Sequence, residues 1–217
     1  MSAADMLEFY TSKFDTVEIN STFYSLPTPT TVKSWKDEVP GDFRFAAKAS
    51  RYITHMKKLR DPQSALERVL DRVDLLSRKL GPVLFQLPPR WQCNTKRLEQ
   101  FLEALPTGHR YAFEMRDHSW HAAEIYRLLS RRRAAFCIYD LAGFQSPVRL
   151  TTDFVYVRLH GPSNAAYSGS YRKASLRKWA KTIGTWSKDL RSIYIYFDND
   201  QKGYAPKDAL ELKSMLK

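Results

Sequence analysis

Short apolar segments alternate with amphipathic helical segments along almost the whole chain, and this alternation constrains the fold more than any other feature. Seven segments rich in Val, Ile, Phe and Tyr predict strands, over residues 16–20, 43–49, 83–87, 111–116, 134–140, 154–160 and 192–199. Most are nearly continuously apolar, which is typical of strands that are covered on both faces. Strands separated by helices predict parallel pairing with right-handed crossover connections.

The intervening segments predict helices over residues 6–13, 30–38, 62–80, 95–105, 122–131, 174–190 and 207–216. The third is the clearest, because apolar residues recur at helical spacing from Ala65 to Leu80. We expect Asp61-Pro62 to start this helix and Gly81-Pro82 to end it. About seven strand–helix units fit either an open doubly wound sheet or a closed (β/α) barrel. No Gly-rich phosphate-binding fingerprint follows a strand, which disfavours a Rossmann-type sheet.

Chain length and composition favour one globular domain over residues 1–217. The 217 residues are 43% hydrophobic, which is enough for a sizeable core. No apolar run approaches the ~20 residues that span a bilayer. The first residues show neither the basic nor the apolar region of a signal peptide, so we expect a cytoplasmic protein. Cys93 and Cys137 are too few and too far apart for a disulfide framework or a zinc site, and we expect two thiols.

Charged or amide side chains stand at the carboxyl end of every predicted strand. Three strands carry such residues two positions apart, so that both face the same side: Glu18 with Asn20, Glu114 with Arg116, and Arg158 with His160. The other four strands end near Lys48, Gln86, Asp140 and Asn199. Burying even a neutral polar group without a partner costs about 2–7 kcal/mol, so these groups must meet one another, water or a ligand. The carboxyl ends of barrel strands converge on one mouth, and a TIM-type (β/α) barrel is therefore favoured.

These residue types suit an enzyme that acts on a small anionic or polar substrate by acid–base chemistry, of the hydrolase, lyase or isomerase type. We expect Glu18 or Glu114 to serve as general acid or base, with His160 as partner. The expected anion-binding cations are Lys48, Arg116 and Arg158, and the orienting amides are Asn20, Gln86 and Asn199. Further expected substrate contacts are Tyr24, His55, Trp120, Asp140 and Tyr171.

Three alternatives remain at this point. The net charge of +12 and the aromatic residues after strands suit a nucleic-acid-binding or nuclease-like barrel. A closed layer of buried ion pairs suits a barrel that binds or scaffolds without chemistry. No cofactor is indicated, although Glu18, Glu114, Asp140 and His160 are side chains that a divalent metal accepts, and a nuclease would need such a metal.

The chain resembles the YecE-like family, which is also called domain of unknown function 72. The resembling blocks run in order across nearly the whole chain: residues 14–24 (FDTVEINSTFY), 43–49, 53–55, 80–89, 113–116, 119–120, 156–161, Tyr171 and 196–199. The resemblance implies a TIM-type barrel and no particular activity. Two features depart from the family pattern. A Gly-Thr-Ser-Gly-Trp-like first strand is absent before residue 6, so we expect seven strands instead of eight. Asp198-Asn199 stands where a pair of Asn is more usual.

Overall fold

The computed structural model describes residues 3–216, which form two compact units with a boundary between Ala134 and Ala135. All seven predicted strands are present. Each end of six of them lies within two residues of the expected position. Within the described residues, no helix is long and apolar enough to cross a membrane. Cys93 and Cys137 are both thiols, as expected.

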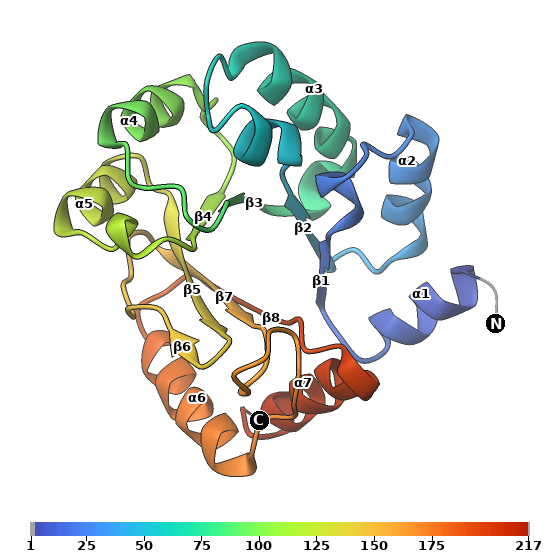
Figure 1. The fold of residues 1–217 in the computed structure, drawn as a ribbon. Coiled ribbons are helices and arrows are strands. Elements are labelled where there is room, and N and C mark those ends of the chain that lie inside the picture. The colour runs from blue at the N-terminus through green and yellow to red at the C-terminus, as the bar shows by residue number, and fades with distance from the viewer. Residues whose placement is uncertain (1–2, 217) are drawn as a thin grey trace. The chain divides into compact units, whose positions relative to one another are not determined.

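The first unit is built on a parallel sheet in the order β1-β2-β3-β4. Its strands are β1 (Thr16–Ile19), β2 (Arg44–Lys48), β3 (Leu80–Leu87) and β4 (Tyr111–Met115). Its helices are α1 (Ala3–Thr11), α2 (Pro29–Glu38), α3 (Gln63–Val73), α4 (Thr95–Ala104) and α5 (Ala123–Arg131). Figure 1 shows α2, α3 and α4 along one face of this sheet. The continuously apolar strands β3 and β4 are buried almost throughout, as their composition predicts.

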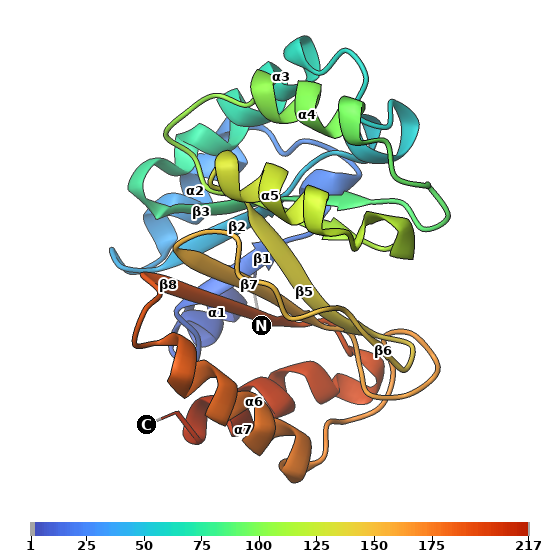
Figure 2. The same ribbon diagram turned by 90° about the vertical axis from the view of Figure 1, so that its left-hand side faces the viewer.

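The second unit contains the parallel strands β5 (Ala135–Leu141), β7 (Phe154–Leu159) and β8 (Ser192–Phe197) in that order. Helices α6 (Lys173–Trp186) and α7 (Tyr204–Ser214) lie side by side next to β7 and β8 (Figure 2). A further short strand, β6 (Phe144–Gln145), pairs antiparallel with β5. It was not predicted, because only the two-residue turn Ala142-Gly143, with both φ angles positive, marks the hairpin.

The predicted helix over residues 62–80 is wrong at both ends. It begins at Gln63, with Pro62 as a cap residue that makes no side-chain cap hydrogen bond, and it ends at Val73. A 3₁₀ segment follows, in which Ser77 has a φ of 54° and breaks the helical path. The turn at Ser77 lets the Lys79 Nζ donate to the carbonyls of Lys36 and Val39 at the end of α2, each at 2.6 Å. Gly81-Pro82 therefore lies inside β3 instead of ending a helix.

Three phenylalanines link α4 to the sheet in the core of the first unit. Phe101 of α4 meets Phe85 of β3 edge-on, with ring centroids 5.0 Å apart, and Phe85 stacks on Phe113 of β4 at 5.2 Å. All three rings are fully buried. Such offset and edge-on aromatic contacts add to the free energy that burial of the rings supplies. This cluster fixes the neighbouring strands β3 and β4, whose carboxyl ends carry candidate site residues.

We predict that Phe101→Ala lowers the free energy of unfolding by about 3–5 kcal/mol, because it empties a packed aromatic site. The matched control is Glu99→Ala on the same helix, where the side chain is 48% exposed and pairs with Arg131 at 3.5 Å. The control is expected to cost less than about 1 kcal/mol. Urea denaturation of both variants measures the difference. Equal losses in the two variants would contradict this account of the core.

Candidate functional site

The strand register places four polar side chains on one face of the first-unit sheet. Gln86 of β3 pairs directly with Glu114 of β4, and Lys48 of β2 pairs with Leu84, two residues before Gln86. Glu18 of β1 pairs with Ala46, two residues before Lys48. Because side chains alternate between faces, these pairings put the four polar side chains on the same side of the sheet, near the carboxyl ends of its strands. The register thus brings together Glu18, Lys48, Gln86 and Glu114, which the sequence placed near the ends of four strands.

Glu114 has no exposed surface, and its carboxylate is paired within the protein. The Arg116 Nε donates to Glu114 Oε1 at 2.5 Å, and the Arg116 side chain is 11% exposed. A buried carboxylate that lost this partner would face a desolvation cost of several kcal/mol. Glu114 therefore holds Arg116 in a fixed position at the end of β4.

Lys48 lies at the end of β2, where a second segment fixes its backbone. The Thr22 hydroxyl is 2.6 Å from the Lys48 carbonyl oxygen and 2.9 Å from the Ile19 carbonyl oxygen, so it ties the end of β1 to the end of β2. The Lys48 Nζ lies 4.4 Å from the centroid of the Phe23 ring, a cation–π contact. This arrangement places an ammonium group on the same face as the Glu114–Arg116 pair.

His55 follows β2 in a π-helical segment, Tyr52–Met56, and packs against the same Phe23 ring. The two ring centroids are 5.1 Å apart, and His55 Nδ1 lies 2.9 Å from the Thr54 hydroxyl. Burial lowers the pKa of His55 below its ordinary value of 6.5. The positive charges of Lys48, Arg116 and Arg51 lower it further, while Glu114 opposes them. His55 is therefore a neutral imidazole at neutral pH, surrounded by cations.

The other predicted site residues of the first unit differ in exposure. Tyr24 is 71% exposed, whereas Gln86 is 6% exposed. Asn20, two residues after Glu18, has a buried Oδ1 with no hydrogen-bond partner among residues 3–216, so a donor from solvent or a ligand fits there. Trp120 has no exposed surface, and its Nε1 donates to the Trp91 carbonyl at 2.6 Å. The structure therefore places Trp120 in the core, under the segment that follows β4.

A second polar cluster occupies the ends of β7 and β8 in the second unit. The Arg158 Nη2 donates to Asp198 Oδ2 at 2.9 Å, and His160 Nδ1 lies 3.1 Å from the same oxygen. Arg158 Nη1 and His160 Nε2 are 3.4 Å apart. Arg158 and His160 are almost completely buried, whereas Asp198 is 24% exposed. Asp198 thus orients two predicted site residues at once.

Asp140 and Tyr171 form the next part of this second cluster. The Tyr171 hydroxyl is hydrogen-bonded to the Asp140 carboxylate, and it accepts from the Gly161 backbone N–H at 3.0 Å. Burial raises the pKa of Asp140 above its ordinary value, while the Tyr171 hydrogen bond and the nearby His160 oppose that rise. Burial and the adjacent Asp140 raise the pKa of Tyr171. Gly161 has a φ of +106°, and a Cβ there would lie 2.2 Å from the Ser168 carbonyl oxygen.

Asn199 connects strand β8 to the loop before α6. Its Nδ2 donates to the Gly169 carbonyl and to Asp208 Oδ2, each at 2.8 Å. Asp208 of α7 also accepts from the Tyr171 N–H at 2.9 Å and from the Ser170 hydroxyl at 2.7 Å. Both Asn199 amide hydrogens are used in this way, so its donors hold the loop in place.

Sequence reasoning did not assign a site role to Arg51, Asp198 or Asp208. Asp198 did carry a signal, because it stands where the family pattern has a second Asn. Arg51 follows Lys48 by three residues, but only the contacts with Tyr24 and His55 reveal its place. Asp208 lies on α7 among other charged residues, and its position in the helical sequence does not distinguish it from those that face solvent.

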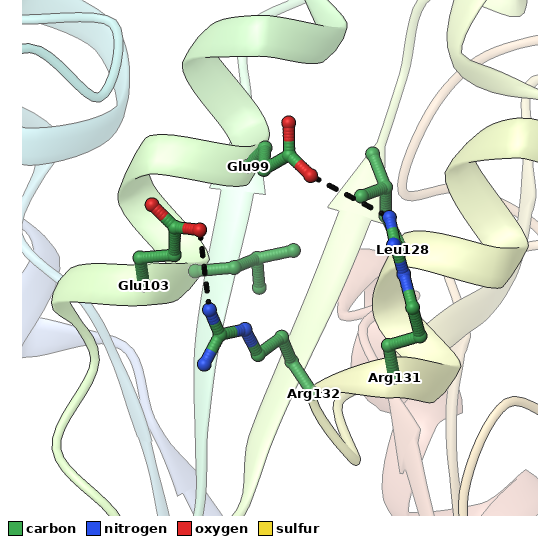
Figure 3. A pocket seen from close by; sticks show the side chains of 6 residues that line it. Glu99, Glu103, Leu128, Arg131 and Arg132 are labelled. Atoms are coloured by element: carbon green, nitrogen blue, oxygen red, sulfur yellow. Dashed lines mark hydrogen bonds and ion pairs between the residues drawn. The ribbon is translucent and has the colours of Figure 1, made fainter.

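A surface pocket of about 260 Å³ lies between α4 and α5, away from every predicted site residue. Figure 3 shows Glu99 and Glu103 of α4 facing Arg131 and Arg132 across it. The ion pairs are 3.5 Å for Glu99–Arg131 and 3.3 Å for Glu103–Arg132. Within residues 3–216, no group of three His, Cys, Asp or Glu side chains is arranged to hold a metal ion.

Comparison with solved structures identifies the fold. A DUF72 family protein from Thermotoga maritima superposes with a TM-score of 0.89 and 27% sequence identity, covering 100% of this chain and 90% of that chain. A DUF72 family protein from Enterococcus faecalis gives a TM-score of 0.88 at 20% identity, covering 97% and 87%. The expected fold class is confirmed: the chain has the α/β fold of TIM type, with seven parallel strands.

Sequence comparison gives the same relationship. UPF0759 protein YunF of Bacillus subtilis is 24% identical over 97% of this chain and 86% of its own length. UPF0759 protein YecE of Escherichia coli is 34% identical over 54% of this chain and 43% of its own length. The family model described as "Protein of unknown function DUF72" matches residues 1–217. The chain therefore belongs to the DUF72 family, the YecE-like family that its sequence blocks resemble.

Proposed function

We propose that the protein is an enzyme that acts on a small anionic or polar substrate, bearing a phosphate or carboxylate group, by acid–base chemistry. One arrangement carries the proposal: Lys48 and His55 pack against the same Phe23 ring, in the unit where Arg116 pairs with the fully buried Glu114, and burial and the nearby cations lower the pKa of His55. Perturbed titratable groups with identifiable charged partners are typical of functional sites.

The cations supply the recognition of an anion. Arg116 presents a planar fork of donors that is already positioned by Glu114, and Lys48 presents a point charge from the neighbouring end of β2. Pre-positioned cations lose little freedom on binding, so more of the interaction energy remains for affinity. A phosphate or carboxylate fits this charge distribution.

His55 supplies the proton acceptor. Because cations lower its pKa, a bound anion that offsets their charge makes protonation of the imidazole easier. The same argument applies to negative charge that develops on a substrate as it loses a proton. Glu18, half-buried on the same face of the sheet, is the second candidate for proton transfer. A barrel that only binds or scaffolds needs no such neutral base.

Inorganic phosphate is predicted to bind the wild-type protein, and Lys48→Met is predicted to weaken that binding by about tenfold or more, as expected for loss of a charged hydrogen bond. Lys13→Met is a matched control, because Lys13 also lies over a phenylalanine ring, that of Phe9, at 5.5 Å. Isothermal titration calorimetry measures both affinities. If both variants bound phosphate equally weakly, the loss would follow from net charge alone and would contradict the proposal.

The His55 imidazole is predicted to titrate below 6.5 in the free protein and at a higher pH with phosphate present. Since the folded pKa is the lower one, the unfolded chain binds more protons just below pH 6.5. The contribution of neutral His55 to stability therefore falls as pH drops through 6.5 toward the folded pKa. NMR titration between about pH 5 and 8 follows the ring signal, and His55→Gln assigns it. A signal that titrates at or above 6.5 and ignores phosphate would refute this role.

Turnover decides between an enzyme and a binding barrel. In a screen of phosphorylated and carboxylated small molecules, we expect at least one substrate of the wild type. His55→Gln should lower kcat on that substrate by about 10²–10⁴-fold, the usual share of general acid–base catalysis. Lys13→Met should keep wild-type kinetics. The proposal would be wrong if the protein bound phosphate but turned over none of the screened molecules. It would also be wrong if His55→Gln kept the wild-type kcat.

A further inference from the structure

The segment between β2 and α3 presents basic and aromatic side chains outward from a fixed backbone. Ile53, Thr54 and Leu59 are buried and anchor the segment. Just before these anchors Tyr52 is 39% exposed, and between Thr54 and Leu59 Met56 is 65% exposed. The anchors and the exposed residues alternate along the chain, so one side of the segment packs inward and the other faces solvent.

The backbone of this segment is unusual. Tyr52–Met56 forms a π-helical turn, closed by the Lys57 N–H donating to the Tyr52 carbonyl at 2.9 Å. Lys58, Leu59 and Asp61 then adopt positive φ angles of 47°, 63° and 41°. Single π-turns and left-handed non-glycine residues are rare, are costly and concentrate at functional sites. The buried Leu59 side chain and the hydrogen bond from its N–H to the Ile53 carbonyl, at 2.9 Å, hold this conformation.

Tyr24 extends the same surface from the end of β1. Its ring is 71% exposed, and the Arg51 guanidinium carbon lies 6.0 Å from its centroid. Below it, Phe23 contacts Tyr24 edge-on at 5.0 Å and also contacts His55. An exposed ring with one cation beside it and a packed ring beneath it is a preformed platform for a flat ligand. We call Tyr24, Arg51, Tyr52, Met56, Lys57 and Lys58 the Tyr24 surface.

The charge of the segment is strongly positive. Residues 48–61 contain five Lys or Arg residues and a single acid, Asp61. Asp61 pairs with Lys57 at 3.5 Å, and its own side chain is 84% exposed. Arg131 and Arg132 at the end of α5, in contrast, pair with Glu99 and Glu103 of α4. The segment over residues 48–61 therefore carries a net positive charge of four, with His55 counted as neutral.

We propose that the Tyr24 surface binds single-stranded nucleic acid, with bases stacking on Tyr24 and Tyr52 and with phosphates contacting Arg51, Lys57 and Lys58. Exposed aromatic rings interleaved with cations are the combination that recognises unpaired bases on a phosphate backbone. A paired duplex keeps its bases stacked inside and offers the rings no face. This inference goes beyond the proposed function and does not depend on it, because binding here requires no turnover.

The test is the fluorescence anisotropy of a labelled oligothymidylate of about 15 nucleotides, titrated with the full chain at about 50–200 mM salt. Tyr24→Ala should weaken binding by about fivefold or more, the effect of losing one stacked base. Tyr24→Phe keeps the ring and should keep the affinity. Both changes lie at an exposed side chain, and circular dichroism checks that the variants fold.

Charge-matched double variants separate local contact from net charge. Lys57→Ala with Lys58→Ala should flatten the slope of log affinity against log salt by about 1.4, as expected for two phosphate contacts on a single strand. Arg131→Ala with Arg132→Ala removes the same charge from the end of α5 and should leave that slope nearly unchanged. Stronger binding of the oligonucleotide than of a duplex or of inorganic polyphosphate supports the proposal. Equal losses in the two double variants, or equal binding of polyphosphate, would overturn it.

Discussion

The first-unit site depends on one ion pair, between Glu114 and Arg116. A carboxylate with no exposed surface has to be neutralised where it lies, and the nearest cation on its own strand end provides this. The pair fixes the guanidinium at the carboxyl end of β4. Burial lowers the pKa of His55, and the positive charges of Lys48, Arg116 and Arg51 lower it further. The position of Arg116 therefore follows from the need to neutralise a buried carboxylate.

The second unit satisfies the same requirement differently. Its buried Arg158 is matched by Asp198, which is partly exposed, and the carboxylate also contacts His160. Asp208 binds Asn199 and two groups of the loop before α6, so it organises backbone and side chain together. Each cluster is a network in which a few carboxylates position several donors. In such a network each carboxylate offsets the burial of several donors.

Local sequence patterns predicted the strands, because short runs of apolar residues between helical segments are typical of buried parallel strands. A period of two residues predicted which polar residues of one strand share a face. The sequence placed Glu18, Lys48, Gln86 and Glu114 near strand ends, and the strand register of the structure puts them on one face of the sheet. The end of α3 could not be predicted from local sequence. The turn at Ser77 accompanies a contact between Lys79 and backbone carbonyls at the end of α2, which are distant in the sequence. Asp208 and Arg51 were missed because each also meets residues distant in the sequence, the loop before α6 for Asp208 and Tyr24 for Arg51. Trp120 was expected to contact substrate, and in the structure its side chain has no exposed surface.

Gly161 illustrates how narrowly one position can restrict sequence change. Any side chain there would meet the Ser168 carbonyl oxygen, and the backbone conformation itself suits only glycine. Every codon change that replaces this residue therefore disturbs the loop that carries Tyr171, and with it the hydrogen bond to Asp140. In a mutational scan, substitutions of Gly161 are therefore expected to be tolerated far less well than substitutions at exposed positions of the same loop.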